Sequence, residues 1–254
     1  MQGSYIDTKY PTYSPSFSPV QTVYIYKDKG CSFESVSMIE YSFSRLLPSH
    51  YRINTLSAND IVSMDWEKDC CLLVFPGGAA NPYNTKLNTK TGNSGNSRIK
   101  EYIEKGGHYL GFCAGAYYGC SAIDFDGKIK TQYELGFFNG EGKGPAMKGF
   151  DYLSSLGTYV VSFAYSLNGV THHAKSFFKG GPYFISEDVM NGIATFDKQE
   201  GLDCPVDSVG CVECKVGEGL CILCSYHVEY DPWLLKKGMG FDGLIEELRQ
   251  QEVK

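Results

Sequence analysis

Several large classes of protein are excluded by what this 254-residue sequence lacks. No apolar run approaches the roughly 20 residues that a membrane-spanning helix needs. Lysine and arginine form no cluster and the formal net charge is -6, so we expect neither nucleic acid nor a membrane surface as a partner. The sequence has no Asn-X-Ser/Thr site, and its N-terminus lacks the basic start and apolar centre of a secretory signal. We therefore expect a cytoplasmic protein.

Cysteine is abundant, at ten residues, in a chain without the features of a secreted protein. In such a chain the cysteines are expected to be reduced thiols rather than disulfides. Residues 1–19 are rich in Tyr, Ser and Pro and predict a flexible tail. Hydrophobic residues make up 43% of the chain, which is enough for a sizeable core, and residues 20–254 are expected to form a single domain.

Strand and helix patterns alternate along the first half of this domain. Four segments have the β-branched, aromatic or continuous apolar character of strands: 20–28, 51–57, 70–78 and 108–113. Helical patterns lie between them at 32–47, where Ser32 is a candidate N-cap, in a short segment capped near Asn59 or Asp60, and at 97–107. Residues 81–96 indicate a polar loop. This alternation predicts a parallel α/β sheet, in which functional residues lie at the carboxyl ends of strands.

The second half of the domain has a different character. Residues 124–200 are rich in Gly, Phe and Tyr with turn signals, which indicates β-hairpins or long loops. Residues 208–232 indicate a hairpin that turns at Gly217, and residues 241–254 indicate a terminal helix.

Six cysteines outside the elbow described below are interpreted as packing residues. Cys70 and Cys71 fall in an apolar strand pattern and are expected to be buried and inert. The predicted hairpin would set two pairs of cysteines opposite each other across its strands: Cys211 with Cys224, and Cys214 with Cys221. Cysteines three apart on one strand point to opposite faces, so we expect no zinc site and no other metal site here.

The segment Gly111-Phe112-Cys113-Ala114-Gly115 has the spacing of a nucleophile elbow, with Cys in the place of Ser. Such an elbow is a strained turn between a strand and a helix, and flanking glycines remove the Cβ atoms that would clash. The start of the following helix would stabilise a thiolate, and the Ala114 N–H would point toward an oxyanion. The alternative interpretation is that Cys113 is one more buried thiol.

A catalytic base for Cys113 must come from the five histidines of the chain. His227 ends an apolar strand pattern, and Glu229 lies two residues on, so the two side chains share a face if the chain stays extended. Glu229 could then orient the imidazole while its other nitrogen faces the thiol. The remaining histidines have no such partner and are interpreted as structural or exposed: His50, His108, His172 and His173.

Five motifs, in order, resemble the class I glutamine amidotransferase-like superfamily and, within it, the N-terminal domain of fungal-type biotin–protein ligase. They are VFPGGAANPY (74–83), GGHYLGFCAGAYYG (106–119), GFFNGEGKGPAMKGFDY (136–152), FFKGGPYF (177–184) and KVGEGLCILCSYHVEYDP (215–232). The resemblance implies a flavodoxin-like three-layer α/β sandwich with a mostly parallel central sheet and β-hairpin additions in the C-terminal half. It implies no cofactor.

The resemblance also implies roles for individual residues. Cys113 would be the nucleophile, His227 the base and Glu229 the residue that orients it. Three residues would donate backbone N–H groups to the oxyanion: Gly77, Gly78 and Ala114. The GKGPA segment (142–146), which contains Gly144, would shape the mouth of the pocket. Tyr117 stands where glutamine-hydrolysing members have Gln, so glutaminase activity is not expected, and the Gly/Arg-rich loop of the ligase catalytic domain is absent from this sequence.

We expect a thiol hydrolase or acyl transferase that acts on a small amide or ester. A second hypothesis is a catalytically silent module that binds a metabolite or regulates a biotin–protein ligase in the carboxylase pathway as a protein partner. A third hypothesis is a redox-sensing or chaperone-like member, in which the elbow thiolate is reversibly oxidised.

Overall fold

The structure is a computed structural model and describes residues 21–88, 94–231 and 234–235. The tail expected at 1–19 and the helix expected at 241–254 lie outside the described residues. Of the helices in the described part of the chain, none is long and apolar enough to cross a membrane.

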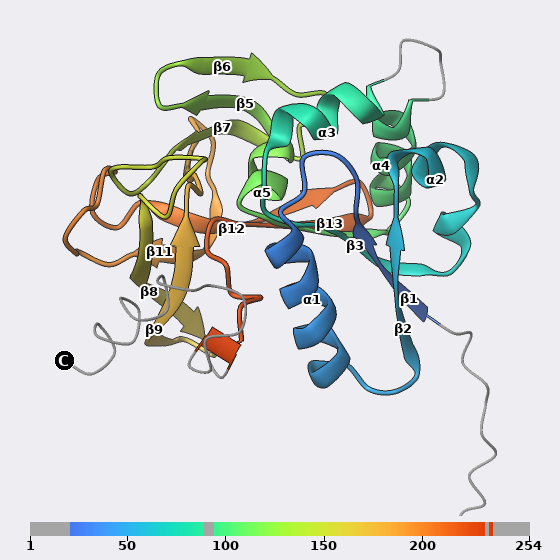
Figure 1. Ribbon diagram of the computed structural model, residues 1–254, viewed down its shortest axis with the longest axis horizontal. Helices are drawn as coiled ribbons and strands as arrows, with labels where there is room; N and C mark the ends of the chain where they lie inside the picture. Colours follow the sequence, from blue (N-terminus) through green and yellow to red (C-terminus); the bar gives the residue numbers. More distant parts are fainter. Residues whose placement is uncertain (1–20, 89–93, 232–233, 236–254) are drawn as a thin grey trace, which may run out of the picture.

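A nine-stranded sheet runs through the molecule (Figure 1). Its parallel half consists, in spatial order, of β2 (Tyr51–Leu56), β1 (Gln21–Tyr26), β3 (Cys70–Phe75), β4 (His108–Phe112) and β13 (Gly219–Cys224). The antiparallel half continues with β12 (Val209–Val216), β11 (Asn191–Phe196), β8 (Thr158–Leu167) and β9 (Val170–Lys179). The hairpin strands expected in the C-terminal half therefore extend the parallel sheet.

A smaller four-stranded sheet lies beside the carboxyl end of β4. Its strands are, in spatial order, β10 (Tyr183–Ile185), β7 (Phe138–Gly144), β5 (Cys120–Phe125) and β6 (Ile129–Gln132). Because β5 follows the elbow within a few residues, this sheet is anchored next to Cys113.

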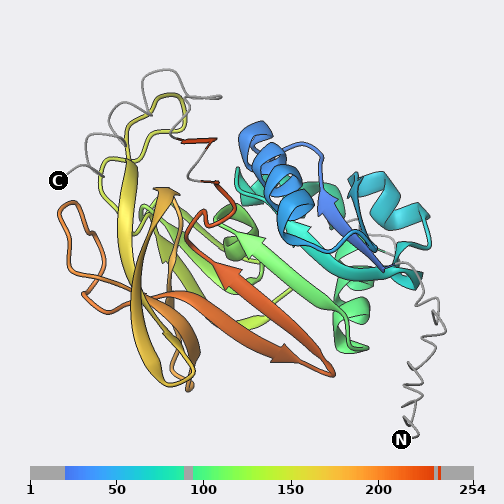
Figure 2. The same ribbon diagram turned by 90° about the horizontal axis from the view of Figure 1, so that it is seen from below.

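Helices cover both faces of the parallel strands (Figure 2). On one face, α1 (Phe33–Leu46) packs Val36 and Ile39 against Val23 and Ile25 of β1. The other face is covered by α2 (Ala58–Ser63), α3 (Ala80–Leu87), α4 (Gly95–Glu104) and α5 (Ala114–Tyr118). Alternate residues of each strand serve the two faces. This arrangement confirms the predicted three-layer α/β fold.

Most helix boundaries agree with the sequence patterns, with three corrections. Ser32 caps α1 as predicted, but α2 is capped by Ser57, which forms a capping box with Asp60, rather than by Asn59 or Asp60. The predicted polar loop at 81–96 contains α3, and α4 begins at Gly95, two residues before the predicted start. The helix α3 is short and exposes mostly polar side chains, so its apolar periodicity was too weak to read.

The predicted register of the C-terminal hairpin is confirmed, since Cys211 pairs with Cys224 and Cys214 with Cys221 across β12 and β13. All four of these cysteines are buried and free. Cys70 and Cys71 were expected to be buried. Both are only half-buried, because they lie at the amino-terminal end of β3.

Candidate active site

Cys113 occupies a strained turn between β4 and α5. Its backbone has φ 47° and ψ -99°, a left-handed conformation that a non-glycine residue rarely adopts. A Cβ on Gly111 would lie 2.4 Å from the Gly115 carbonyl oxygen, and a Cβ on Gly115 would lie 2.2 Å from the Phe75 carbonyl oxygen. Both flanking positions therefore require glycine, as the elbow spacing predicts.

His227 lies just beyond β13 and is held against Cys113. Its backbone N–H donates to the Phe177 carbonyl oxygen at 3.0 Å. Its ring Nδ1 is 2.6 Å from Glu229 Oε1, and both side chains are buried. The Cys113 thiol lies beside the imidazole in the same cavity and is among the groups that raise its pKa, while Cys113 Sγ itself donates to the Lys179 carbonyl oxygen at 3.3 Å. The structure thus brings together all three residues of the predicted Cys-His-Glu set.

The charge state of His227 follows from these contacts. Burial disfavours the charged imidazole, but the Glu229 carboxylate and the Cys113 thiol outweigh it and raise the pKa of His227 to about 10. The ring is therefore protonated at neutral pH. A protonated imidazole next to Cys113 can serve as a proton donor to a group bound at the thiol.

Two serines of α1 complete the arrangement, and sequence reasoning missed both. Ser35 Oγ donates to Glu229 Oε1 at 2.8 Å and accepts from the Gly77 N–H at 2.9 Å. Ser42 Oγ donates to the Glu229 carbonyl oxygen at 2.7 Å. Residues seven apart lie on the same face of a helix, so two serines on the apolar stripe of α1 were the available signal.

The backbone donors expected from the resemblance need one correction. The Gly77 N–H is bonded to Ser35 Oγ, so it does not face an oxyanion. Gly77 has a different role, because a Cβ there would lie 2.5 Å from His227 Cε1. In the same loop, the Ser32 N–H donates to the Gly77 carbonyl oxygen and the Ala79 N–H donates to the Gly30 carbonyl oxygen. Neither of these two backbone hydrogen bonds uses the Gly78 N–H. The Ala114 N–H is the first of α5 and has no acceptor within the helix.

Gly77→Ala is expected to displace the His227 ring, because the added methyl group overlaps its Cε1 position. A shift of about 1 Å in a catalytic group can cost roughly 10²-fold in rate. We expect a loss of that order in ester hydrolysis, measured as kcat/KM, in a protein that still melts cooperatively. Unchanged hydrolysis in the folded variant would contradict this placement of the ring.

Two adjoining cavities open at Cys113, and their walls also share Gly78, Ala79, Phe150, Tyr152 and Lys179. The first, the aromatic cavity, has a volume of about 250 Å³ and is lined by rings and by Gly78, Ala114 and Tyr117. The second, here called the polar cavity, has a volume of about 420 Å³ and is lined by Ser32, Glu34 and His227 together with the rings of Phe177 and Tyr230. Cys113 lines both, so a carbonyl group bound at the thiol would have one substituent in each.

Tyr117 and Gly144 are related in a way that the sequence did not show. Tyr117 lines the aromatic cavity, and its hydroxyl donates to the Gly180 carbonyl oxygen at 3.1 Å. A Cβ on Gly144 would lie 2.2 Å from that hydroxyl. That its segment shapes the pocket mouth stays a prediction, and Gly144 itself is not among the residues that line either cavity. It acts indirectly, by leaving room for the Tyr117 side chain.

The other histidines lie away from Cys113. His108 is at the amino end of β4, opposite the elbow, and His50 precedes β2. His172 and His173 are exposed on the edge strand β9. Over the residues that the structure describes, no group of three or more His, Cys, Asp or Glu side chains is arranged to hold a metal ion.

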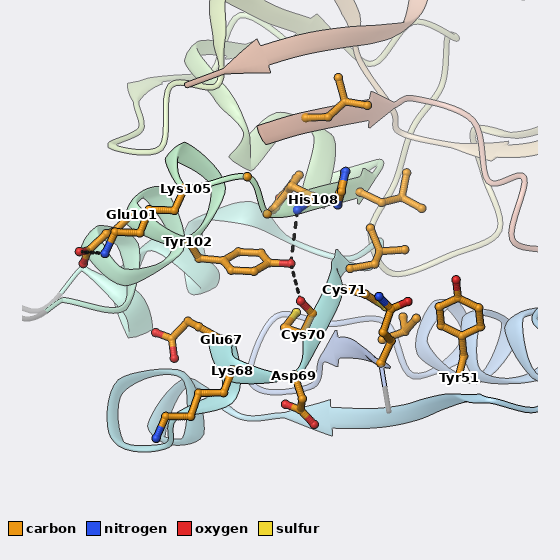
Figure 3. A pocket seen from close by; sticks show the side chains of 18 of the residues that line it. Tyr51, Glu67, Lys68, Asp69, Cys70, Cys71, Glu101, Tyr102, Lys105 and His108 are labelled. Carbon is orange, nitrogen blue, oxygen red and sulfur yellow. Dashed lines mark hydrogen bonds and ion pairs between the residues drawn. The ribbon is translucent and has the colours of Figure 1, made fainter. Parts of the chain in front are cut away.

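A larger groove of about 980 Å³ lies at the amino-terminal end of the parallel strands (Figure 3). There the Tyr102 hydroxyl donates to the Cys70 carbonyl oxygen and accepts from the His108 N–H, both at 3.3 Å. Lys105 is paired with Glu101 at 2.5 Å. Burial raises the pKa of the Cys70 thiol to about 12, so this cysteine is not a nucleophile at neutral pH. The groove therefore lacks the chemistry found at Cys113.

Comparisons with known proteins agree with this architecture. Residues 21–254 match the family described as "Biotin-protein ligase, N terminal". An uncharacterised protein of Chlamydia muridarum is 31% identical over 222 residues, covering 84% of this chain and 82% of that protein. The biotin–protein ligase of Schizosaccharomyces pombe is 28% identical over 217 residues, covering 82% of this chain. The match spans only 33% of the ligase.

Solved structures share the fold at low sequence identity. A chain of PurLQS from Thermotoga maritima has a TM-score of 0.59 and 13% identity, over 92% of this chain and 99% of that chain. A ThuA-like protein from Bacteroides uniformis has a TM-score of 0.52 and 12% identity, over 94% and 93%. The fold is thus glutamine amidotransferase-like. Because the family match extends over nearly the whole chain, the protein belongs to the biotin–protein ligase N-terminal family.

Proposed function

We propose that the protein is a cysteine hydrolase or acyl transferase that acts on a small amide or ester. The observation that carries the proposal is the buried chain of contacts from Glu229 through His227 to Cys113. The elbow exposes the thiol to two cavities, and the raised pKa of His227 supplies a proton donor next to it. The proposed reaction needs Cys113 as a free thiol, and cysteines stay reduced in the cytoplasm, where we propose that the protein acts.

In the first half of the proposed reaction, the Cys113 thiolate attacks the carbonyl carbon and forms a C–S bond. The negative charge moves to the carbonyl oxygen, toward which we assign the Gly78 and Ala114 N–H groups. The intermediate then collapses and the bond to the leaving group breaks. His227 Nε2 gives its proton to the departing nitrogen or oxygen, which leaves a thioester on Cys113 and a neutral imidazole.

In the second half, His227 takes a proton from water or from an acceptor hydroxyl or amine. The activated oxygen or nitrogen attacks the thioester carbon, and the C–S bond breaks to release the product and regenerate the thiolate beside the imidazolium. Glu229 keeps Nδ1 protonated throughout, and Ser35 keeps Glu229 in place. Each residue of the contact chain thus has a role.

Selective alkylation tests whether Cys113 is activated. At pH 7, iodoacetamide is expected to modify Cys113 about tenfold faster or more than Cys204, a half-buried thiol whose pKa burial raises to about 11. The rates are measured by peptide mass spectrometry after timed quenching. Cys113→Ser removes the fast phase, whereas Cys204→Ser leaves it intact. Equal rates at the two cysteines would be evidence against an activated thiol.

A further inference from the structure

The two cavities at Cys113 differ in their access to the catalytic proton. His227 lines the polar cavity and does not line the aromatic cavity. In the proposed reaction His227 must reach the leaving group in order to protonate it. The leaving group therefore occupies the polar cavity, and the acyl group occupies the aromatic cavity.

Apolar side chains form most of the wall of the aromatic cavity. They come from α5, from β5 and β6 and from the segments that follow β6 and β7: Tyr117, Ile123, Phe125, Ile129, Tyr133 and Phe150. Phe125 makes edge contacts with Tyr117 at 5.7 Å and with Phe150 at 5.2 Å between ring centroids. Such rings favour a flat or apolar group placed among them.

Two hydroxyl groups at this wall are engaged in hydrogen bonds within the protein. The Tyr117 hydroxyl donates to the Gly180 carbonyl oxygen at 3.1 Å, and the Tyr133 hydroxyl donates to Asn81 Oδ1 at 2.5 Å. Among the described residues that line the cavity, none is acidic and Lys179 is the one charged side chain. Its Nζ donates to the Ser154 carbonyl oxygen at 2.7 Å and lies 5.8 Å from the Phe150 ring centroid.

We propose that the aromatic cavity selects an uncharged, apolar acyl group of about the size of a hexanoyl or phenylacetyl group. This inference rests on the proposed function, since it assigns the acyl half of the same substrate. An amino-acid acyl group such as that of glutamine carries an ammonium and a carboxylate, and the cavity offers no acidic partner for the first. Taking the ammonium out of water without a partner is costly. The cavity volume of about 250 Å³ suits the smaller apolar groups.

A series of p-nitrophenyl esters tests the assignment on the full chain. Because each buried methylene adds to binding, kcat/KM is expected to be about tenfold or more higher for hexanoyl and phenylacetyl esters than for the acetyl ester. The anionic hemisuccinyl ester is expected to react no faster than the acetyl ester. Acylation of Cys113 is followed in parallel by mass spectrometry of acid-quenched protein.

Two variants sharpen the test. Ile129→Arg places a cation in the wall of the aromatic cavity and is expected to raise the ratio of hemisuccinyl to hexanoyl turnover by about tenfold. Ile185→Ala, on β10 and outside the wall, is the control and is expected to leave the ratio unchanged. Both ratios are measured within one protein, so a change in the amount of folded protein does not affect them.

The outcomes separate the two proposals. If Cys113 is acylated but acetyl or hemisuccinyl esters react as fast as hexanoyl esters, the acyl-group assignment is overturned and the proposed function stands. If no ester acylates Cys113, the proposed function fails, and the acyl-group assignment fails with it. An unchanged ratio in Ile129→Arg would also overturn the assignment.

Discussion

Glu229→Gln is expected to lower kcat/KM for ester hydrolysis by roughly 10⁴-fold, the size of loss seen in kcat when the carboxylate of a catalytic triad is neutralised. Glu229 Oε1 accepts from both His227 Nδ1 and Ser35 Oγ. A glutamine can retain these bonds through its amide oxygen, but it carries no negative charge to stabilise the imidazolium. The variant therefore removes the negative charge beside the His227 imidazolium while it preserves most of the packing.

The matched control is Glu213→Gln on β12, where the carboxylate accepts a hydrogen bond from Asn191 at 2.8 Å, away from the elbow. This change is expected to leave ester hydrolysis within about twofold of the wild-type value, as is usual for a surface polar substitution. Equal losses in the two variants would mean that the Glu229 effect is not specific to the His227 contact.

The raised pKa of His227 predicts a particular dependence of stability on pH. In the unfolded chain the imidazole loses its proton near its ordinary pKa of 6.5, whereas in the folded protein it holds the proton up to about 10. The stabilisation is therefore fully present below pH 6.5 and is lost as the pH rises toward 10. The slope is at most about 1.4 kcal/mol per pH unit in that window, and less where other groups share the proton.

Denaturant unfolding at several pH values between 6.5 and 9.5 measures this slope. The wild-type protein is expected to lose stability faster with rising pH than Glu229→Gln, in which the partner that raises the pKa is neutral. Lysines, tyrosines and the other cysteines titrate in both proteins, so the difference between the two curves isolates His227. Parallel curves would show that Glu229 does not hold the proton on His227.

The elbow and the His227–Glu229 pair were readable in the sequence because both depend on local rules. A cysteine forced to a left-handed φ needs small neighbours, and Gly111 and Gly115 are two residues away on either side. Glu229 was expected beside His227 because residues two apart in an extended segment share a face. The contact is instead made in a turn, since the Tyr230 N–H donates to the His227 carbonyl oxygen at 3.2 Å. The cross-strand pairs of cysteines followed from the turn at Gly217.

Contacts between distant segments were not readable in this way. Ser35 and Glu229 are 194 residues apart, and a serine on a helix has many ordinary explanations. That contact also decided the role of Gly77, because the hydroxyl of Ser35 takes the N–H that the resemblance assigned to the oxyanion. The function of each glycine in this loop thus depends on which side chain the fold places against it.

The aromatic cavity was hidden for a related reason. Its wall combines Tyr117 of α5 and Phe150 after β7, which lie in motifs of the resemblance, with residues of β5, β6 and the segment after β6, which lie in none. Tyr117 was expected at the pocket from the sequence, but Ile123, Phe125, Ile129 and Tyr133 were not, because the second sheet places them around the elbow.

The most direct test of the central claim is to locate the acyl group after a brief reaction with p-nitrophenyl hexanoate and an acid quench. Peptide mass spectrometry is expected to find one hexanoyl group, labile to hydroxylamine, on the peptide that contains Cys113. Cys204→Ser should show the same adduct, whereas Cys113→Ala should show none and should lose turnover. Equal turnover in Cys113→Ala, or hexanoyl groups found on lysines alone, would contradict the assignment of Cys113 as the nucleophile.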